Sequence, residues 1–262
     1  MSLPRLIATD LDGTLVGRDG TISRRTAKVL AQVAAAGSIV VLATGRPLRW
    51  LPVAYEQLDT EYLTICANGA VTYDPATDAV LDSRPLPPDL LADLATKLAT
   101  AIPGMTFAAE IDDGRRMVHE PAYPVAFDDG SRELPLSEVV ARPAVKLLGS
   151  ATDRRAEELA ALVLTAVAHR IEATHSSSIG MVEMSASGVT KGAMLSALAG
   201  RLGIDAADVL AFGDMPNDVT MLRWAGRAVV VANAHPAARE LADAVTLSNV
   251  DDGVAEYLER LL

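Results

Sequence analysis

Short unbroken runs of apolar residues alternate with stretches in which apolar residues recur every three or four positions. The run Leu6–Thr9 is followed by a helical pattern over Thr26–Ala36 and by a second run, Ile39–Ala43. Such runs predict strands that are buried on both faces, and the helical spacing predicts an amphipathic helix. A strand, a helix and a strand within about 40 residues form a parallel crossover unit. The chain is therefore predicted to begin as an α/β fold.

The same pattern continues after this unit and resumes near the end of the chain. It predicts a helix over Leu48–Leu58 and strands at Tyr62–Cys66, Val209–Phe212, Ala228–Val231 and Ala244–Leu247, with a helix from Thr190 to Leu202. The turn Ala67–Ala70 resembles a tight hairpin turn. These elements predict a Rossmann-like core with a parallel sheet.

The pattern changes at the proline-rich stretch Arg84–Pro88, which resembles a hinge into an inserted unit. We predict helices at Asp89–Thr100 and Asp153–His169, and strands at Met105–Glu110, Arg115–His119, Ala144–Leu148, Ile171–His175 and Gly180–Met184. Two helices on one mostly antiparallel sheet form an α+β domain. The predicted organisation is a core of residues 1–83 and 186–262 with an inserted α+β domain at 84–185.

An acidic loop follows the first strand directly, with the sequence Asp10-Leu11-Asp12-Gly13-Thr14. Side chains alternate along a strand, so Asp10 and Asp12 are expected to point the same way, with Leu11 turned toward the core. Two like charges at this distance resist joint ionisation unless a cation or a shared proton stabilises them. A divalent metal or a phosphate site is therefore indicated, and a simple turn or helix N-cap is the alternative.

Three later loops add groups suited to an anion or a metal. Thr44, Gly45 and Arg46 follow the second strand, and Lys191 stands in the first turn of a helix that Thr190 caps. A third loop, Gly213–Asp218, is acidic and follows another strand. Parallel strands bind ligands at their carboxyl ends, so these loops are expected at one edge of the sheet. A plain strand-to-helix connection and a solvated lysine are the alternatives.

Composition narrows the class of protein and of partner. The net charge is -11, and the basic residues are scattered along the 262-residue chain, which argues against a nucleic-acid footprint. No apolar run approaches the roughly 20 residues that span a membrane, so we expect an unexported, cytoplasmic protein. Cys66 lies in an apolar strand and is expected to be a core thiol. His119, His169, His175 and His235 show no metal-ligand spacing.

The four motifs together resemble the haloacid dehalogenase superfamily of phosphatases. Only 34 positions separate Asp10 from Thr44, whereas 147 separate Thr44 from Lys191, so an inserted cap domain falls between the second and third motifs. This placement, the α/β makeup of the insertion and the Asn68-Gly69 turn before it resemble the Cof-type branch with a type IIB cap.

The resemblance implies a role for each matching position. Asp10 would be the nucleophile that forms an aspartyl-phosphate, and Asp12 would be the general acid and then the base. Mg2+ would be held by the Asp10 carboxylate, the Asp12 carbonyl and Asp214, with Asp218 as support. The phosphate would be bound by the amides of Leu11 and Gly45 and by the side chains of Thr44, Lys191 and Asn217.

The function expected from this resemblance is a Mg2+-dependent phosphatase for small phosphorylated metabolites, with sugar phosphates as the expected class. A phosphohexomutase of the same superfamily and a non-catalytic ligand-binding relative are the alternatives. The cap loops Asp112–Gly114 and His175–Ser178 are the candidates for substrate selection. The protein is expected to act as a monomer or homodimer, without nucleic-acid or membrane partners.

Overall fold

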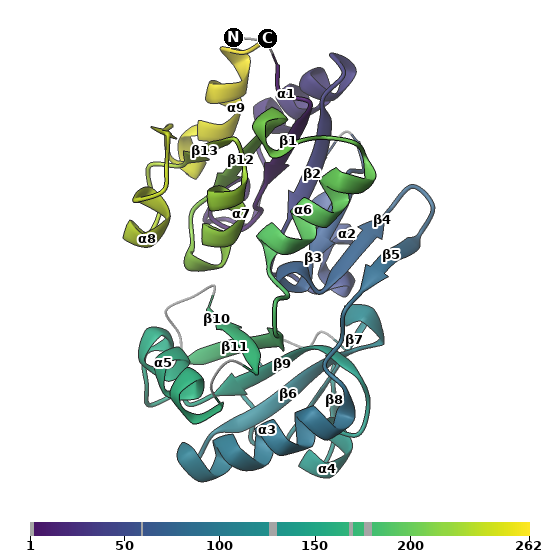
Figure 1. Cartoon of the computed structure of the whole chain (residues 1–262), viewed down its shortest axis with the longest axis vertical. Helices are drawn as coiled ribbons and strands as arrows, with labels where there is room; N and C mark the ends of the chain where they lie inside the picture. Colours follow the sequence, from purple (N-terminus) through teal and green to yellow (C-terminus); the bar gives the residue numbers. More distant parts are fainter. Residues whose placement is uncertain (1–2, 59, 126–129, 168–169, 176–179) are drawn as a thin grey trace. The chain divides into compact units, whose positions relative to one another are not determined.

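The computed structural model describes residues 3–58, 60–125, 130–167, 170–175 and 180–262 (Figure 1). The chain divides into two compact units. One comprises residues 1–46, 50–81 and 190–262, and the other comprises 47–49 and 82–189. The first unit contains a mostly parallel sheet and the second a mostly antiparallel one. The predicted α/β fold with an inserted α+β domain is confirmed.

The core sheet has eight strands within the described residues, in the order β14-β13-β12-β1-β2-β3-β4-β5. The first six are parallel, and β4 is antiparallel to β3. The strands are β1 (Leu6–Thr9), β2 (Ile39–Ala43), β3 (Leu63–Cys66), β4 (Val71–Asp74), β5 (Ala79–Ser83), β12 (Val209–Gly213), β13 (Arg227–Val230) and β14 (Ala244–Val245). Strand β1 lies in the middle of this order, and all four of its residues are buried. The first acidic loop therefore begins at the centre of the sheet.

Two long helices of the first unit begin at residues whose side chains cap them. Ser23 accepts a hydrogen bond from the Thr26 amide before α1, and Thr190 accepts one from the Ala193 amide before α6. The helices are α1 (Arg24–Ala35), α2 (Pro52–Tyr55), α6 (Lys191–Arg201), α7 (Val219–Trp224), α8 (Pro236–Arg239) and α9 (Gly253–Glu259). Leu6 and Ala8 of β1 pack in one apolar cluster with Leu195 of α6. None of the described helices combines the length and apolar character needed to cross a membrane.

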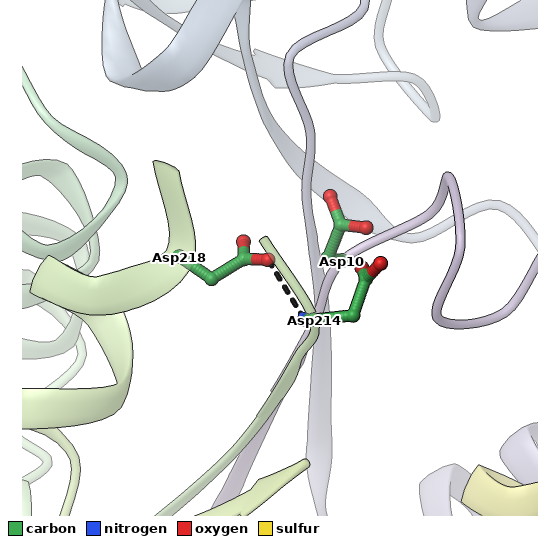
Figure 2. Close-up of side chains that lie close together, drawn as sticks. All are labelled: Asp10, Asp214 and Asp218. Carbon is green, nitrogen blue, oxygen red and sulfur yellow. Dashed lines mark hydrogen bonds between the residues drawn. The ribbon is translucent and has the colours of Figure 1, made fainter. Parts of the chain in front are cut away.

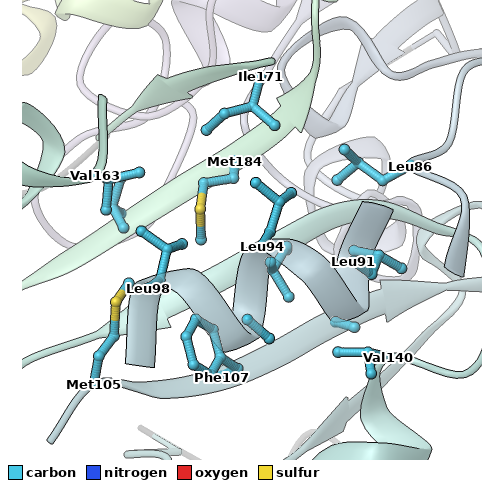
Figure 3. Close-up of a cluster of buried hydrophobic side chains, with 14 of the residues drawn as sticks. Leu86, Leu91, Leu94, Leu98, Met105, Phe107, Val140, Val163, Ile171 and Met184 are labelled. Atoms are coloured by element: carbon cyan, nitrogen blue, oxygen red, sulfur yellow. The ribbon is translucent and has the colours of Figure 1, made fainter. Parts of the chain in front are cut away.

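The inserted unit has a six-stranded sheet within the described residues, in the order β10-β11-β9-β6-β7-β8. Its strands are β6 (Thr106–Ile111), β7 (Arg116–His119), β8 (Arg132–Glu133), β9 (Ala144–Ser150), β10 (Ile171–Thr174) and β11 (Met181–Ala186). Its helices are α3 (Pro88–Ala101), α4 (Leu136–Val139) and α5 (Ala156–Val167). Leu91, Leu94 and Leu98 of α3 point toward the sheet and share an apolar core with Phe107 and Met184 (Figure 3). The helical and strand periods therefore build this core as the sequence predicts.

The alternate residues of these strands form a buried polar row within the inserted unit. Glu110, Lys146 and Glu183 lie on neighbouring strands β6, β9 and β11, and each is buried. The Lys146 ammonium lies 2.5 Å from a Glu183 carboxylate oxygen, and Glu110 pairs with Arg49. An unpaired buried charge is costly. The two ion pairs therefore stabilise charged side chains that the alternation along the strands directs to a buried face of the sheet.

The predicted helix over Leu48–Leu58 is wrong as one continuous helix. A 3-10 turn over Leu48–Trp50 is followed by the four-residue helix α2, with Pro52 at its first position. Proline has no amide hydrogen and its ring clashes with a preceding helical turn, so the helix restarts there. The sequence analysis also did not predict several short elements, because so few residues carry little periodicity. These are strands β4, β5 and β8 and helices α4, α8 and α9.

Candidate active site

Three carboxylates converge at the carboxyl ends of the central strands. Asp10 follows β1 and Asp214 follows β12, which are parallel neighbours, and the Asp10 amide donates to the Phe212 carbonyl at 3.0 Å. Asp218 closes the 3-10 turn Pro216–Asp218. One carboxylate oxygen from each acid lies within 4.8 Å of the other two, and all three residues are buried (Figure 2). The topology thus joins acids that are about 200 positions apart in the chain.

Asp218 organises the loop that carries Asp214. Its Oδ2 accepts hydrogen bonds from the amides of Asp214 and Met215, both at 3.0 Å (Figure 2 draws the first). A Cβ at Gly213 would lie 2.7 Å from the Asp218 Cβ, so the glycine permits this close approach. One oxygen of Asp218 therefore holds the backbone of this loop in place.

Lys191 is enclosed by two of these acids. Its side chain is 0% exposed, and its Nζ donates to Asp10 Oδ1 and to Asp218 Oδ1, each at 2.6 Å. Thr190 caps the helix that presents the lysine. Full burial excludes the solvated lysine that the sequence left open. The ammonium instead holds Asp10 and Asp218 as a hydrogen-bonded ion triad.

The first acidic loop closes tightly over Asp214. Gly13 has a φ of +90°, and a Cβ there would lie 2.4 Å from Asp214 Oδ2, so only glycine fits. The Thr14 hydroxyl donates to Asp214 Oδ1 at 2.8 Å. The two loops therefore fix the Asp214 carboxylate between them.

The site has an excess of negative charge. Burial raises the pKa of Asp10 well above its ordinary value, although Lys191 opposes this shift. Burial, with Asp218 nearby, raises the pKa of Asp214 from 3.8 to about 6. Burial alone would lower the pKa of Lys191, but Asp10 and Asp218 together raise it. Three carboxylates and one ammonium leave two negative charges, and oxygen ligands of this kind suit a hard divalent cation.

Asp12 lies outside this cluster and pairs with Arg46. The guanidinium donates to both carboxylate oxygens, with Nε 2.8 Å from Oδ2 and Nη2 2.6 Å from Oδ1. The Asp12 side chain is 51% exposed, whereas Arg46 is 16% exposed. The hydrogen bond to Asp12 raises the pKa of Arg46. An accessible carboxylate beside three buried ones suits a group that exchanges protons with substrate and water.

The other predicted phosphate ligands lie in the loops around these acids. Thr44 is buried and its Oγ1 accepts from the Arg46 amide at 3.0 Å, across Gly45. The Leu11 side chain is buried in the core, and its carbonyl accepts from the amides that follow it in the loop. Asn217 Nδ2 donates to Asn68 Oδ1 at 3.1 Å. All of these residues belong to the first unit.

The sequence assigned no role to Thr14 or Asn68, and it indicated Arg46 as a group for an anion rather than as the partner of Asp12. A hydroxyl or guanidinium beside an acidic loop is a usable signal, but its partner acid is not visible in the sequence. The turn Asp112–Gly114 lies in the inserted unit, where the Ser83 hydroxyl donates to Asp113. Residues 176–178 of the predicted loop His175–Ser178 lie outside the described residues.

Replacing Asp214 by asparagine is expected to stabilise the metal-free protein near neutral pH. A carboxyl whose pKa is raised by folding binds its proton more tightly when folded, so its contribution to stability is lost between about pH 4 and about pH 6. In EDTA at about pH 7.5, Asp214→Asn should raise the free energy of unfolding by on the order of 1–3 kcal/mol, with little difference at about pH 4. Urea unfolding at both pH values measures this.

The second part of this experiment measures the effect of added Mg2+ on the Tm. Added Mg2+ should raise the Tm of the wild-type protein more than that of Asp214→Asn, because a ligand that binds only the folded state stabilises it. Glu61→Gln, which removes an exposed carboxylate, should behave as the wild type in both parts. Equal stability of wild type and Asp214→Asn at neutral pH in EDTA would contradict the charge excess.

Comparison with known proteins agrees with this geometry. A family model described as haloacid dehalogenase-like hydrolase matches residues 7–258. The chain is 28% identical, over 98% of its length and 97% of the relative, to the 5-amino-6-(5-phospho-D-ribitylamino)uracil phosphatase YitU of Bacillus subtilis (strain 168). It is 31% identical to the HMP-PP phosphatase of Yersinia enterocolitica, over 98% and 95% of the two chains. The crystal structure of TM0651 from Thermotoga maritima is similar with a TM-score of 0.81 and 28% identity, covering 99% and 98% of the chains. The chain therefore belongs to the haloacid dehalogenase-like hydrolases and, among them, to the Cof-type phosphatases, which hydrolyse phosphoric monoesters.

Proposed function

We propose that this protein is a Mg2+-dependent phosphatase that hydrolyses small phosphorylated metabolites, with sugar phosphates as the preferred class, through a phosphorylated Asp10. The observation that carries the proposal is the position of Asp10. It lies at the end of the central strand, buried beside Asp214 and bonded to Lys191 at 2.6 Å. A carboxylate held by an ammonium within an acidic cluster is suited to attack a phosphorus atom.

In the first step, a carboxylate oxygen of Asp10 forms a bond to phosphorus while the bond from phosphorus to the alcohol oxygen breaks. The leaving alkoxide takes a proton from Asp12. In the second step, Asp12 accepts a proton from water, which attacks the same phosphorus and returns Asp10 as a carboxylate with release of inorganic phosphate. General acid and base catalysis of this kind contributes about 100- to 10,000-fold.

Arg46 has a place in this cycle because it occupies both oxygens of Asp12. The pair must open, at least at one oxygen, before Asp12 can carry a proton to the leaving group. Since the Asp12 side chain is half exposed, this movement requires no repacking of the core. Arg46 would then return Asp12 to one orientation between the two steps.

Asp10 and Asp214 would hold Mg2+ through their carboxylates, and Asp12 through its backbone carbonyl. When bound, the ion neutralises negative charge on the phosphoryl group and so favours attack by an anionic nucleophile. The two negative charges left by the acids and Lys191, and the raised pKa values of Asp10 and Asp214, support a divalent cation here. Mg2+ prefers oxygen ligands, and Asp10, Asp12 and Asp214 would supply them.

The preference for sugar phosphates has partial support among the relatives. The B. subtilis relative is named for a substrate with a phosphorylated ribityl chain, which is a polyhydroxylated phosphate monoester. The Y. enterocolitica relative is named for a different substrate, HMP-PP. The relatives therefore support a small phosphorylated metabolite more firmly than any one class of sugar.

The test is a panel of phosphate monoesters assayed with the purified protein and Mg2+, followed by phosphorus NMR. We expect inorganic phosphate as the product, the highest kcat/KM for a phosphorylated polyhydroxylated substrate, and no turnover in excess EDTA. Full activity in EDTA would contradict the metal. An isomerised sugar phosphate without free phosphate would identify a phosphohexomutase instead.

A further inference from the structure

The hairpin turn between β3 and β4 has an unusual backbone. Its three residues have positive φ angles, 51° at Ala67, 57° at Asn68 and 105° at Gly69. Side chains of L-residues rarely adopt this region, and two of the three residues are not glycine. All three are buried. Such a conformation persists only where the surrounding structure holds it, and it is common at functional sites.

The turn binds the backbone on both sides of Gly45. The Asn68 amide donates to the Thr44 carbonyl at 3.1 Å, and the Ala67 amide donates to the Arg46 carbonyl at 2.9 Å. These two carbonyls lie on either side of the Gly45 amide, for which the family resemblance implies a bond to the phosphate. The turn therefore fixes the orientation of the Gly45 peptide.

The same turn contacts the helix that presents Lys191. A Cβ at Gly69 would lie 2.3 Å from the Thr190 carbonyl oxygen and 3.0 Å from the Lys191 amide nitrogen. No larger residue fits at this distance, so the turn packs directly on the first residue of α6. The third motif is thereby placed against the second.

The Asn68 side chain completes the connection to the fourth motif. Its Oδ1 accepts a hydrogen bond from Asn217 Nδ2 at 3.1 Å, and Asn68 is buried. The Oδ1 of Asn217 is buried and has no hydrogen-bond partner in the described part of the chain. Because the Asn68 Oδ1 is an acceptor, the Asn217 side-chain amide turns its nitrogen, and not its oxygen, toward Asn68. This nitrogen keeps a second hydrogen that Asn68 does not use.

We propose that the turn Ala67–Gly69 is the element that aligns the three phosphate-binding loops, and that Asn68 is a positioning residue that orients the Asn217 amide toward the phosphate. The proposal rests on the proposed function and on the phosphate-binding role that the family resemblance implies for Asn217. An ordinary hairpin turn would need neither the buried asparagine nor the contacts to three separate motifs.

A double-mutant cycle between Asn68 and Asn217 tests the proposal, with p-nitrophenyl phosphate as substrate. Asn68→Gly allows the positive φ without strain, whereas Asn68→Ala makes it strained. Both variants remove the acceptor oxygen. We expect each to lower kcat/KM by about 10- to 100-fold, as loss of a supporting partner does at other sites, and to raise the inhibition constant of inorganic phosphate. In an Asn217→Ala background, the further loss should shrink to about twofold or less.

Asp78→Gly is the matched control, because Asp78 has a φ of 50° between β4 and β5 of the same sheet and accepts from Tyr73. It should leave kcat/KM unchanged, whatever it does to the Tm. Two results would overturn the role of Asn68. The losses in kcat/KM could multiply in the double variant, or the loss in each of the Gly and Ala variants could follow its loss of Tm. A folded wild-type protein without phosphatase activity would overturn the proposed function, and this inference with it.

Discussion

Replacement of Asp10 by asparagine is expected to abolish phosphatase turnover while leaving the fold intact. The change removes the attacking oxygen and one negative charge but hardly alters volume, and the asparagine carbonyl can still accept from Lys191. Loss of a nucleophile costs on the order of 10,000-fold or more in kcat, since the remaining groups still bind and polarise the substrate. Steady-state assays with p-nitrophenyl phosphate measure the loss, and thermal unfolding checks the fold.

Asp12→Asn is the informative comparison for Asp10→Asn. It should reduce turnover by about 100- to 10,000-fold and leave the first step with p-nitrophenyl phosphate less affected, because this leaving group needs little protonation. Phosphorylated protein should then accumulate and appear by mass spectrometry after an acid quench. Asp10→Asn should show no such species. Phosphoprotein in Asp10→Asn, or more than a few per cent of wild-type turnover, would remove the nucleophile assignment.

Replacement of Lys191 by methionine is expected to abolish activity and to destabilise the protein. The variant leaves Asp10 and Asp218 buried without the ammonium that lies 2.6 Å from each. Removing one partner of a buried ion pair costs about 3–5 kcal/mol, because the other charge stays buried. In EDTA at about pH 7.5, urea should unfold Lys191→Met at a clearly lower concentration than wild type. The difference should narrow as the pH is lowered to about 4.5, because burial raises the pKa of Asp10 and favours its protonated form.

Lys97→Met is the matched control for this experiment. Lys97 also pairs with an aspartate, at 3.0 Å from Asp93, but both side chains are largely exposed. Exposed pairs contribute about 0–1 kcal/mol, so this variant should keep its stability and its activity. If the two lysine variants had the same urea midpoint at neutral pH, the buried triad would not stabilise the fold.

The sequence alone determined the elements that have strong periodicity and the loops that end them. Strand β1 and helix α6 were predicted nearly to the residue, because an unbroken apolar run and a threonine cap are local signals. The acidic loop at Asp10 and the loop at Asp214 were found for the same reason, since the chemistry of each stands in a few contiguous residues. The prediction of one helix over Leu48–Leu58 was wrong, because the apolar spacing continues across Pro52 although a proline interrupts a helix.

Only the tertiary structure decided which of these groups meet. Lys191 and Asp10 are 181 positions apart, and Asn217 and Asn68 are 149 apart, so no local pattern could pair them. The order of the strands brings these loops to one sheet edge. Burial then decided their chemistry: Lys191 is enclosed and charged, Asp12 is half exposed beside Arg46, and the pKa of Asp214 is raised to about 6. The sequence specifies which chemical groups are present, because the side chains are part of the covalent structure. The distances between these groups and their exposure to solvent depend on the packing of the whole chain.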